Sequence, residues 1–145
     1  MLYLQLVLLQ HKKTVTVDLK GVKFSQVGDM FNEFFENHLP FELTGAQKRV
    51  LREIRADINT GHHMNRLLQG DVGSGKTIVA LMSALLAIDN GFQSCIMAPT
   101  EILARQHAEG ISDLLKEMDI RVEIITGSTK KRDRKPILEL SLIHI

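Results

Sequence analysis

The sequence lacks the features of a secreted or membrane-spanning protein. Its single cysteine, Cys95, excludes an internal disulfide and favours a reducing compartment, and the apolar neighbours of Cys95 predict a buried strand position. The most apolar stretch, residues 1–9, is far too short to span a bilayer, and it has neither a basic run before it nor a small-residue cleavage site after it. We therefore expect a soluble, cytoplasmic protein without a membrane partner.

The chain also lacks an excess of charge of either sign. Its 18 basic and 17 acidic residues give a formal net charge of +1. Overall electrostatic attraction to nucleic acid is therefore absent, and any such contact must come from local patches. The 145 residues, 44% of them hydrophobic, are typical of one globular domain with a core.

Hydrophobic spacing predicts helices in the first part of the chain. Residues 1–9 predict a short helix that packs against something larger, whereas residues 14–23 fit either a short strand or an extended linker. Residues 27–39 predict a helix that Pro40 stops, with its phenylalanines as a packed face. Thr44 is the predicted N-cap of an amphipathic helix that ends at Gly61. Its expected buried stripe is Val50, Leu51, Ile54 and Ile58.

Strand and helix patterns alternate in the rest of the chain. Residues 64–69, 94–98 and 121–126 are strand candidates, and residues 78–88 predict a helix that is apolar almost all round. A further helix carries Leu103, His107, Ile111, Leu114 and Met118 on one face. This alternation predicts an α/β fold in which helices flank a parallel sheet, preceded by helical segments.

Residues 70–77 match the phosphate-binding P-loop pattern, a glycine, four residues, a second glycine, lysine and threonine. The motif stands between a predicted strand and a predicted helix, which is the context it requires. Glycines allow the backbone N–H groups to wrap around phosphate oxygens, and the helix N-terminus adds partial positive charge. The predicted nucleotide-binding residues here are Gly70, Asp71, Val72, Gly73, Ser74, Gly75, Lys76 and Thr77.

Two of these residues are the candidate catalytic groups. Lys76 can neutralise the charge that shifts between the terminal phosphates, and Thr77 can offer its hydroxyl to Mg²⁺. The motif indicates a nucleoside triphosphate site but does not identify the work performed, because kinases, GTPases and motors share it.

The adjacent histidines His62 and His63 invite a metal interpretation, but they point different ways and no third ligand is visible. His107, on an apolar helix face, is interpreted as a core or hinge residue.

Three longer segments resemble superfamily two helicases, and within them the RecG family of bacterial ATP-dependent DNA helicases. Residues 39–47 resemble the region that recognises adenine, residues 64–77 the family's form of motif I, and residues 97–107 its motif Ia. The resemblance covers roughly residues 3–139. It implies a RecA-like ATP-binding domain that uses ATP and Mg²⁺, with Gln47 reading the adenine base.

The resemblance also implies contacts to the DNA backbone. In motif Ia these fall on Pro99, Thr100, Glu101, Arg105 and Gln106, and in the following loop on Thr126 and Gly127. Physically, Thr100 offers a hydroxyl at a helix start, which suits either a phosphate or an ordinary N-cap. The basic run at residues 130–132 fits either phosphate binding or a solvated face.

The same resemblance predicts a domain division and a function. Residues 1–40 are expected to be a helical linker that trails a missing N-terminal wedge domain, and residues 41–145 the first part of the helicase ATP-binding domain. The implied parent protein is a monomeric double-stranded DNA translocase that acts on forks and Holliday junctions in recombination and repair. Its acidic box and second motor lobe are not in this chain, so we expect the polypeptide alone to bind ATP weakly and not to hydrolyse it. Residues 140–145 fit either the next strand or a non-native run-off.

Two rival functions stay open on the sequence. The motor of a transcription-repair coupling factor has similar segments and would bind RNA polymerase, although Asn65 and Gln69 favour the RecG pattern. A non-motor P-loop protein, such as a small-molecule kinase or a regulatory module, is the second rival. The segments around Gln47 and Thr100 argue against it.

Overall fold

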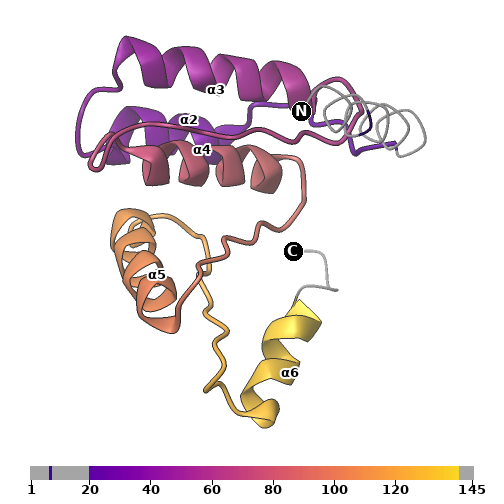
Figure 1. Cartoon of the computed structure of the whole chain (residues 1–145), viewed down its shortest axis with the longest axis vertical. Coiled ribbons are helices and arrows are strands. Elements are labelled where there is room, and N and C mark those ends of the chain that lie inside the picture. Colours follow the sequence, from indigo (N-terminus) through magenta and orange to yellow (C-terminus); the bar gives the residue numbers. More distant parts are fainter. Residues whose placement is uncertain (1–6, 8–19, 141–145) are drawn as a thin grey trace. The chain divides into compact units, whose positions relative to one another are not determined.

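The computed structural model describes Val7 and residues 20–140. The predictions for the rest of residues 1–9, for residues 14–19 and for the tail after Leu140 lie outside this part of the chain. The described residues form two units: residues 20–25 with Leu43–Val79, and Gln26–Glu42 with residues 80–140. Figure 1 shows the helices in chain order.

The main helix of the first unit is α3, Gly45–Ile58, and its start confirms the predicted cap. The Thr44 hydroxyl accepts the Gln47 N–H at 3.2 Å, and the Gln47 side-chain oxygen accepts the Thr44 N–H at 2.8 Å. This reciprocal capping box satisfies two N–H groups that the first helical turn leaves without partners. Within the predicted stripe, Leu51 and Ile54 are buried, while Val50 and Ile58 are half-buried.

The chain reverses after α3 at Gly61, whose φ of +77° is a left-handed conformation that favours glycine. Gly21 then donates its N–H to the Gly61 carbonyl at 2.8 Å, and Lys20 forms an isolated antiparallel bridge with His62. Arg66 adds a side-chain link to α3 through ion pairs with Glu53, at 2.7 Å, and with Asp57. These contacts fix the segment that leads into the P-loop.

Helix α4, Lys76–Asp89, starts at the P-loop and confirms the predicted apolar helix. Its buried residues are Ile78, Val79, Leu81, Met82, Leu85, Leu86 and Ala87. Most of them lie at the spacing of one broad face of the helix, whereas Ala80 is exposed, so α4 is buried over more than a narrow stripe but not all round.

The second unit begins with a short helical segment that confirms the prediction for residues 27–39. Helix α2, Asp29–Glu33, continues into a π-helical turn, η1, Phe34–His38, and Leu39 leaves the helical conformation just before Pro40. Phe34 is fully buried, and the rings of Phe31 and Phe35 stack at 6.5 Å. The phenylalanines therefore pack, as the sequence predicts.

The end of α4 holds this segment in place. The Asp89 carboxylate accepts the N–H groups of Gly28 and Met30 at 3.0 Å and of Phe31 at 3.1 Å. Asp89 thus caps α2 from a distant part of the chain. A negative side chain is stabilising there because the N-terminus is the positive end of the helix dipole. A Cβ at Gly28 would lie 2.6 Å from the Asp89 carboxylate, so a larger residue there would displace this cap.

Helices α5, Glu101–Leu115, and α6, Lys131–Leu140, complete the second unit. Ile111, Leu115 and the following Met118 are buried, and His107 and Leu114 are half-buried. Leu103, on the same face, is 38% exposed, so this face of α5 is not buried along its whole length. The reason is that nothing among the described residues covers the first turn of α5, where Ile102 is also exposed.

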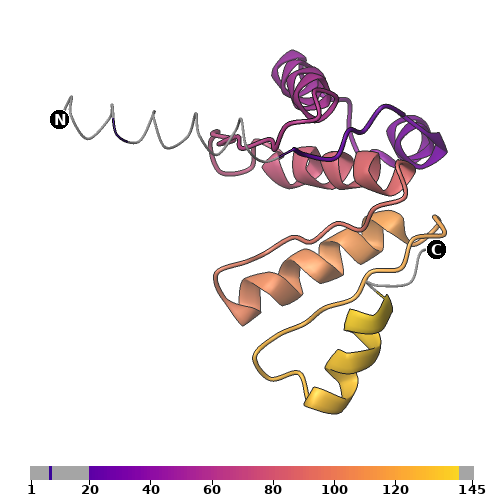
Figure 2. The same cartoon turned by 90° about the vertical axis from the view of Figure 1, so that its right-hand side faces the viewer.

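The three strand candidates carry no β-ladder within the described ranges. Residues 64–69, 92–98 and 120–126 are drawn as coil (Figure 1 and Figure 2). The predicted parallel sheet stays a prediction, because a strand is defined by hydrogen bonds to neighbours. Cys95 is exposed, which corrects the prediction of a buried position. The prediction assumed that Cys95 lies in a sheet whose faces are covered by helices, and this segment has no β-ladder among the described residues.

Candidate functional site

The P-loop has the backbone conformations that its glycines predict. Gly73 and Gly75 adopt φ of +79° and +78°, which residues with a side chain rarely adopt. The Ser74 N–H donates to the Asp71 carbonyl at 3.2 Å, and the Ile78 N–H donates to the Gly75 carbonyl at 3.1 Å, which starts α4. The loop is therefore a compact turn that leads directly into a helix N-terminus.

The Lys76 side chain folds back over this loop. Its Nζ donates to the carbonyls of Gly70, at 2.8 Å, and Asp71, at 2.7 Å, and lies 3.5 Å from the Ser74 hydroxyl oxygen. Thr77, the next residue, is exposed. An ammonium, a helix N-terminus and left-handed glycines in one loop are the groups that a triphosphate requires.

Gln47 connects α3 to the P-loop. Its residue is only 9% exposed, and its side-chain nitrogen donates to the Ser74 carbonyl at 2.9 Å while its oxygen serves the capping box. The structure thus brings the predicted adenine-reading residue against the predicted phosphate-binding loop. An amide carries a second hydrogen and a second lone pair, so these bonds leave it capacity toward a base.

In the second unit, the predicted DNA-contacting residues gather at the start of α5. The Thr100 hydroxyl accepts the Leu103 N–H at 3.3 Å, so Thr100 is an N-cap. Cap and phosphate contact are compatible, because the hydroxyl hydrogen remains available to donate. Pro99 and Gln106 are exposed and take no part in the contacts that follow.

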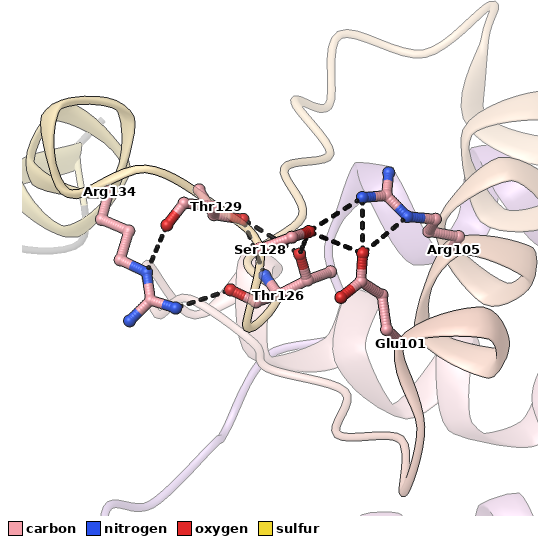
Figure 3. Close-up of polar contacts among 6 residues, drawn as sticks. All are labelled: Glu101, Arg105, Thr126, Ser128, Thr129 and Arg134. Carbon is pink, nitrogen blue, oxygen red and sulfur yellow. Dashed lines mark hydrogen bonds and ion pairs between the residues drawn. The ribbon is translucent and has the colours of Figure 1, made fainter.

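Glu101 and Arg105 join motif Ia to the loop at residues 126–129 (Figure 3). One Glu101 carboxylate oxygen accepts bonds from the Ser128 hydroxyl at 2.6 Å and from two Arg105 nitrogens at 2.8 and 3.2 Å. Arg105 also lies 3.3 Å from the Ser128 oxygen. Two segments that the sequence predicts separately as DNA contacts are therefore bonded to each other.

Sequence reasoning missed two members of this cluster, Thr129 and Arg134. The Thr129 hydroxyl accepts the Thr126 N–H at 2.9 Å, and Arg134 donates to the carbonyls of Thr126 and Thr129 at 2.6 and 3.1 Å (Figure 3). The hydroxyl-rich run at residues 126–129 could have indicated Thr129, because serine and threonine hydroxyls often bond to nearby backbone groups. Arg134 has no comparable local signal.

Charge pairing perturbs titration in both units. The Ser128 hydroxyl and the Arg105 guanidinium hold the pKa of Glu101 below its usual range. Likewise the hydrogen bond that Arg66 donates to Asp57 lowers the pKa of Asp57, and the bonds that Arg66 donates to Asp57 and Glu53 raise its own pKa. Both carboxylates are therefore ionised at neutral pH.

The described residues offer neither a cluster of metal ligands nor a helix that could span a membrane. Among residues 20–140 and Val7, no three His, Cys, Asp or Glu side chains gather in the way a metal ion needs, at His62 and His63 or elsewhere. The helices in the same part of the chain are all too short or too polar to span a bilayer.

The comparison with family models decides the family. The DEAD/DEAH box helicase model matches residues 44–145, which include the P-loop and the cluster around Glu101. The chain belongs to the DEAD/DEAH box helicase family. Its P-loop helicase fold is supported by a solved structure, described as RecG bound to a three-way DNA junction, with a TM-score of 0.82 and 39% identity. That match covers 90% of this chain and 18% of the other.

Relatives within the helicase family confirm the resemblance to RecG. The chain is 53% identical over 105 residues to the ATP-dependent DNA helicase RecG of Bacillus subtilis, covering 72% of this chain and 15% of that protein. It is 46% identical to RecG of Borreliella burgdorferi, covering 81% and 18%, and 44% identical to RecG of Synechocystis, covering 93% and 16%. The chain thus spans less than a fifth of the length of these relatives.

Proposed function

We propose that this chain is the nucleotide-binding segment of an ATP-dependent DNA helicase of the RecG type, part of a longer protein that acts on branched DNA. The observation that carries the proposal is the P-loop, where left-handed glycines, the start of α4 and the Lys76 ammonium converge on one loop. The names of the relatives, and the three-way junction bound by the RecG of the solved structure, support DNA as the partner.

ATP would bind with its phosphates in the P-loop and Mg²⁺ beside them. Lys76 would exchange the carbonyls of Gly70 and Asp71 for the terminal phosphates, and Thr77 would offer its hydroxyl to the metal. Gln47 would contact the adenine while it supports the loop at Ser74. Charge neutralisation by a preorganised lysine is worth most at the transition state, when charge moves between the phosphates.

DNA phosphates would bind at the start of α5 and at the loop that follows residue 125. Pro99, Thr100 and the α5 N-terminus would supply one contact, assisted by Arg105 and Gln106, and Thr126 and Gly127 the next. Glu101 would hold the two contacts together through Arg105 and Ser128. These contacts position the duplex without reading its sequence.

The parallel sheet belongs to the same proposal. Residues 64–69, 94–98 and 121–126 would pair with strands supplied by the rest of the longer protein, since the chain covers so little of its relatives. Residues 1–40 would link this domain to an upstream wedge domain. The longer protein would act as a monomer in the bacterial cytoplasm. That location suits a protein that acts on DNA, and the relatives are bacterial proteins.

Unwinding of a synthetic three-way junction by the full-length protein with MgATP tests the function. We expect ATP-dependent strand separation that Lys76→Ala abolishes. No response to any DNA would contradict the proposal and favour a non-motor P-loop protein. Release of stalled RNA polymerase, without activity on the junction, would instead favour the transcription-repair coupling factor.

A further inference from the structure

Residues 126–129 form a turn that neighbouring side chains hold on two sides. From α6, Arg134 donates to the Thr126 carbonyl at 2.6 Å and to the Thr129 carbonyl at 3.1 Å (Figure 3). From α5, Glu101 accepts the Ser128 hydroxyl at 2.6 Å. The planar guanidinium suits this task because its N–H donors form a rigid fork that can serve two acceptors at once.

The grip on Thr126 also orients the next N–H group. The Thr126 carbonyl and the Gly127 N–H belong to one peptide group, and no described peptide bond is cis. In a trans peptide the C=O and N–H point in opposite directions. By holding the carbonyl, Arg134 therefore directs the Gly127 N–H away from itself.

One N–H group of the turn is left for a ligand. The N–H groups of Thr126 and Thr129 bond within the turn and the Ser128 backbone N–H is directed at the Glu101 carboxylate, whereas the Gly127 N–H donates to no residue in the described part of the chain. Backbone N–H groups of this kind bind the phosphate oxygens of DNA.

We propose that Arg134 is a positioning residue that orients the turn at residues 126–129 for DNA binding. It fixes the turn so that the Gly127 N–H faces a backbone phosphate, and it does not bind the phosphate itself. The inference rests on the proposed function, which places a phosphate at Thr126 and Gly127. It adds a residue in α6 to contacts that the sequence assigns to motif Ia and the loop.

Two arginines of α6 make a matched test in the full-length protein. Arg132 is 89% exposed, and among the described residues its side chain pairs only with Asp133, so Arg132→Gln removes the same charge without disturbing the turn. Binding of a fluorescent three-way junction is measured over a salt series. We expect Arg134→Gln to weaken binding about tenfold, as for loss of one hydrogen bond to a charged group, and Arg132→Gln about twofold or less.

Arg134→Lys separates positioning from charge. A lysine keeps the positive charge but not the fork, so we expect it to bind DNA as weakly as Arg134→Gln while the slope of log K against log salt stays at the wild-type value. A direct phosphate contact would instead be restored by lysine, and its loss would lower that slope by about one. Recovery by lysine, or equal effects of Arg134→Gln and Arg132→Gln, would overturn the proposal.

A second variant keeps the test valid if substitutions at Arg134 impair folding. Gly127→Pro removes the N–H that Arg134 is proposed to direct, and Gly127→Ala is its control, because a Cβ there meets nothing within 4 Å. We expect Gly127→Pro to weaken junction binding about tenfold, and Gly127→Ala, which keeps the N–H, to weaken it clearly less. Equal binding by both would contradict the inference.

The outcomes also separate this inference from the proposed function. DNA-independent ATP hydrolysis and the melting temperature check that each variant is folded. A wild-type protein that ignores the junction contradicts the proposed function and with it the inference. A wild-type protein that binds it, with Arg134 and Gly127 variants that bind equally well, contradicts the inference alone.

Discussion

The P-loop and the turn at residues 126–129 offer anion sites built in different ways. The P-loop takes its shape from eight consecutive residues, two of them left-handed glycines, and presents one ammonium. The turn has no left-handed residue and takes its shape from side chains of three segments, with Glu101 on α5 and Arg134 on α6. Single changes should therefore be severe in the P-loop and graded in the turn.

The largest effect is expected at Lys76. Because its ammonium is the charge nearest the expected phosphates, we expect Lys76→Ala to lower ATP hydrolysis by the full-length protein by more than about 100-fold. Its bonds are to carbonyls of its own exposed loop, so the melting temperature should change little. Lys48→Ala, on the exposed side of α3, is the matched control and should retain full activity. An active Lys76→Ala variant would remove the basis of the comparison.

Gln47 tests whether the P-loop also depends on a side chain from another segment, helix α3. Gln47→Ala removes the bond to Ser74 and half of the capping box, and we expect about tenfold weaker nucleotide binding. Fluorescent ATP and GTP analogues distinguish its two roles. Loss of preference for adenine indicates base reading, whereas equal weakening for both nucleotides indicates support of the loop alone.

Two glycines compare a left-handed position in the P-loop with a helical position in α5. Gly73→Ala places a side chain at a φ of +79°, which costs about 1–2 kcal/mol, although a Cβ there meets nothing within 4 Å. Gly110→Ala lies inside α5 with equally open surroundings, and should stabilise the protein by about 1 kcal/mol. Urea unfolding measures both. A stabilising Gly73→Ala would show that the loop does not require this conformation.

The smallest effect is expected from the titration of Glu101. Its pKa is lowered in the folded protein, so its bonds to Ser128 and Arg105 are present above the ordinary pKa and are lost as pH falls through the folded value. A carbon-detected NMR titration of the Glu101 carboxyl follows this directly. We expect Ser128→Ala to raise its pKa toward the ordinary value. An unchanged pKa would show that the Ser128 bond does not hold the turn.

Local pattern predicted much of the first region and little of the second. The P-loop, its helix and the Thr44 cap depend on residues a few positions apart, so spacing alone was sufficient. The bond from Arg134 to Thr126 depends on how α6 folds back on the preceding turn, which no local pattern encodes. Exposure of Cys95 was mispredicted for a related reason, because burial is decided by what covers a segment.

The most direct test of the account is the rate of ATP hydrolysis by the full-length protein, measured with linear, forked and three-way junction DNA. The account joins an ATP site and DNA contacts in one chain, so it predicts a rate that rises with DNA and rises most with the junction. A rate that is the same with and without DNA would contradict it.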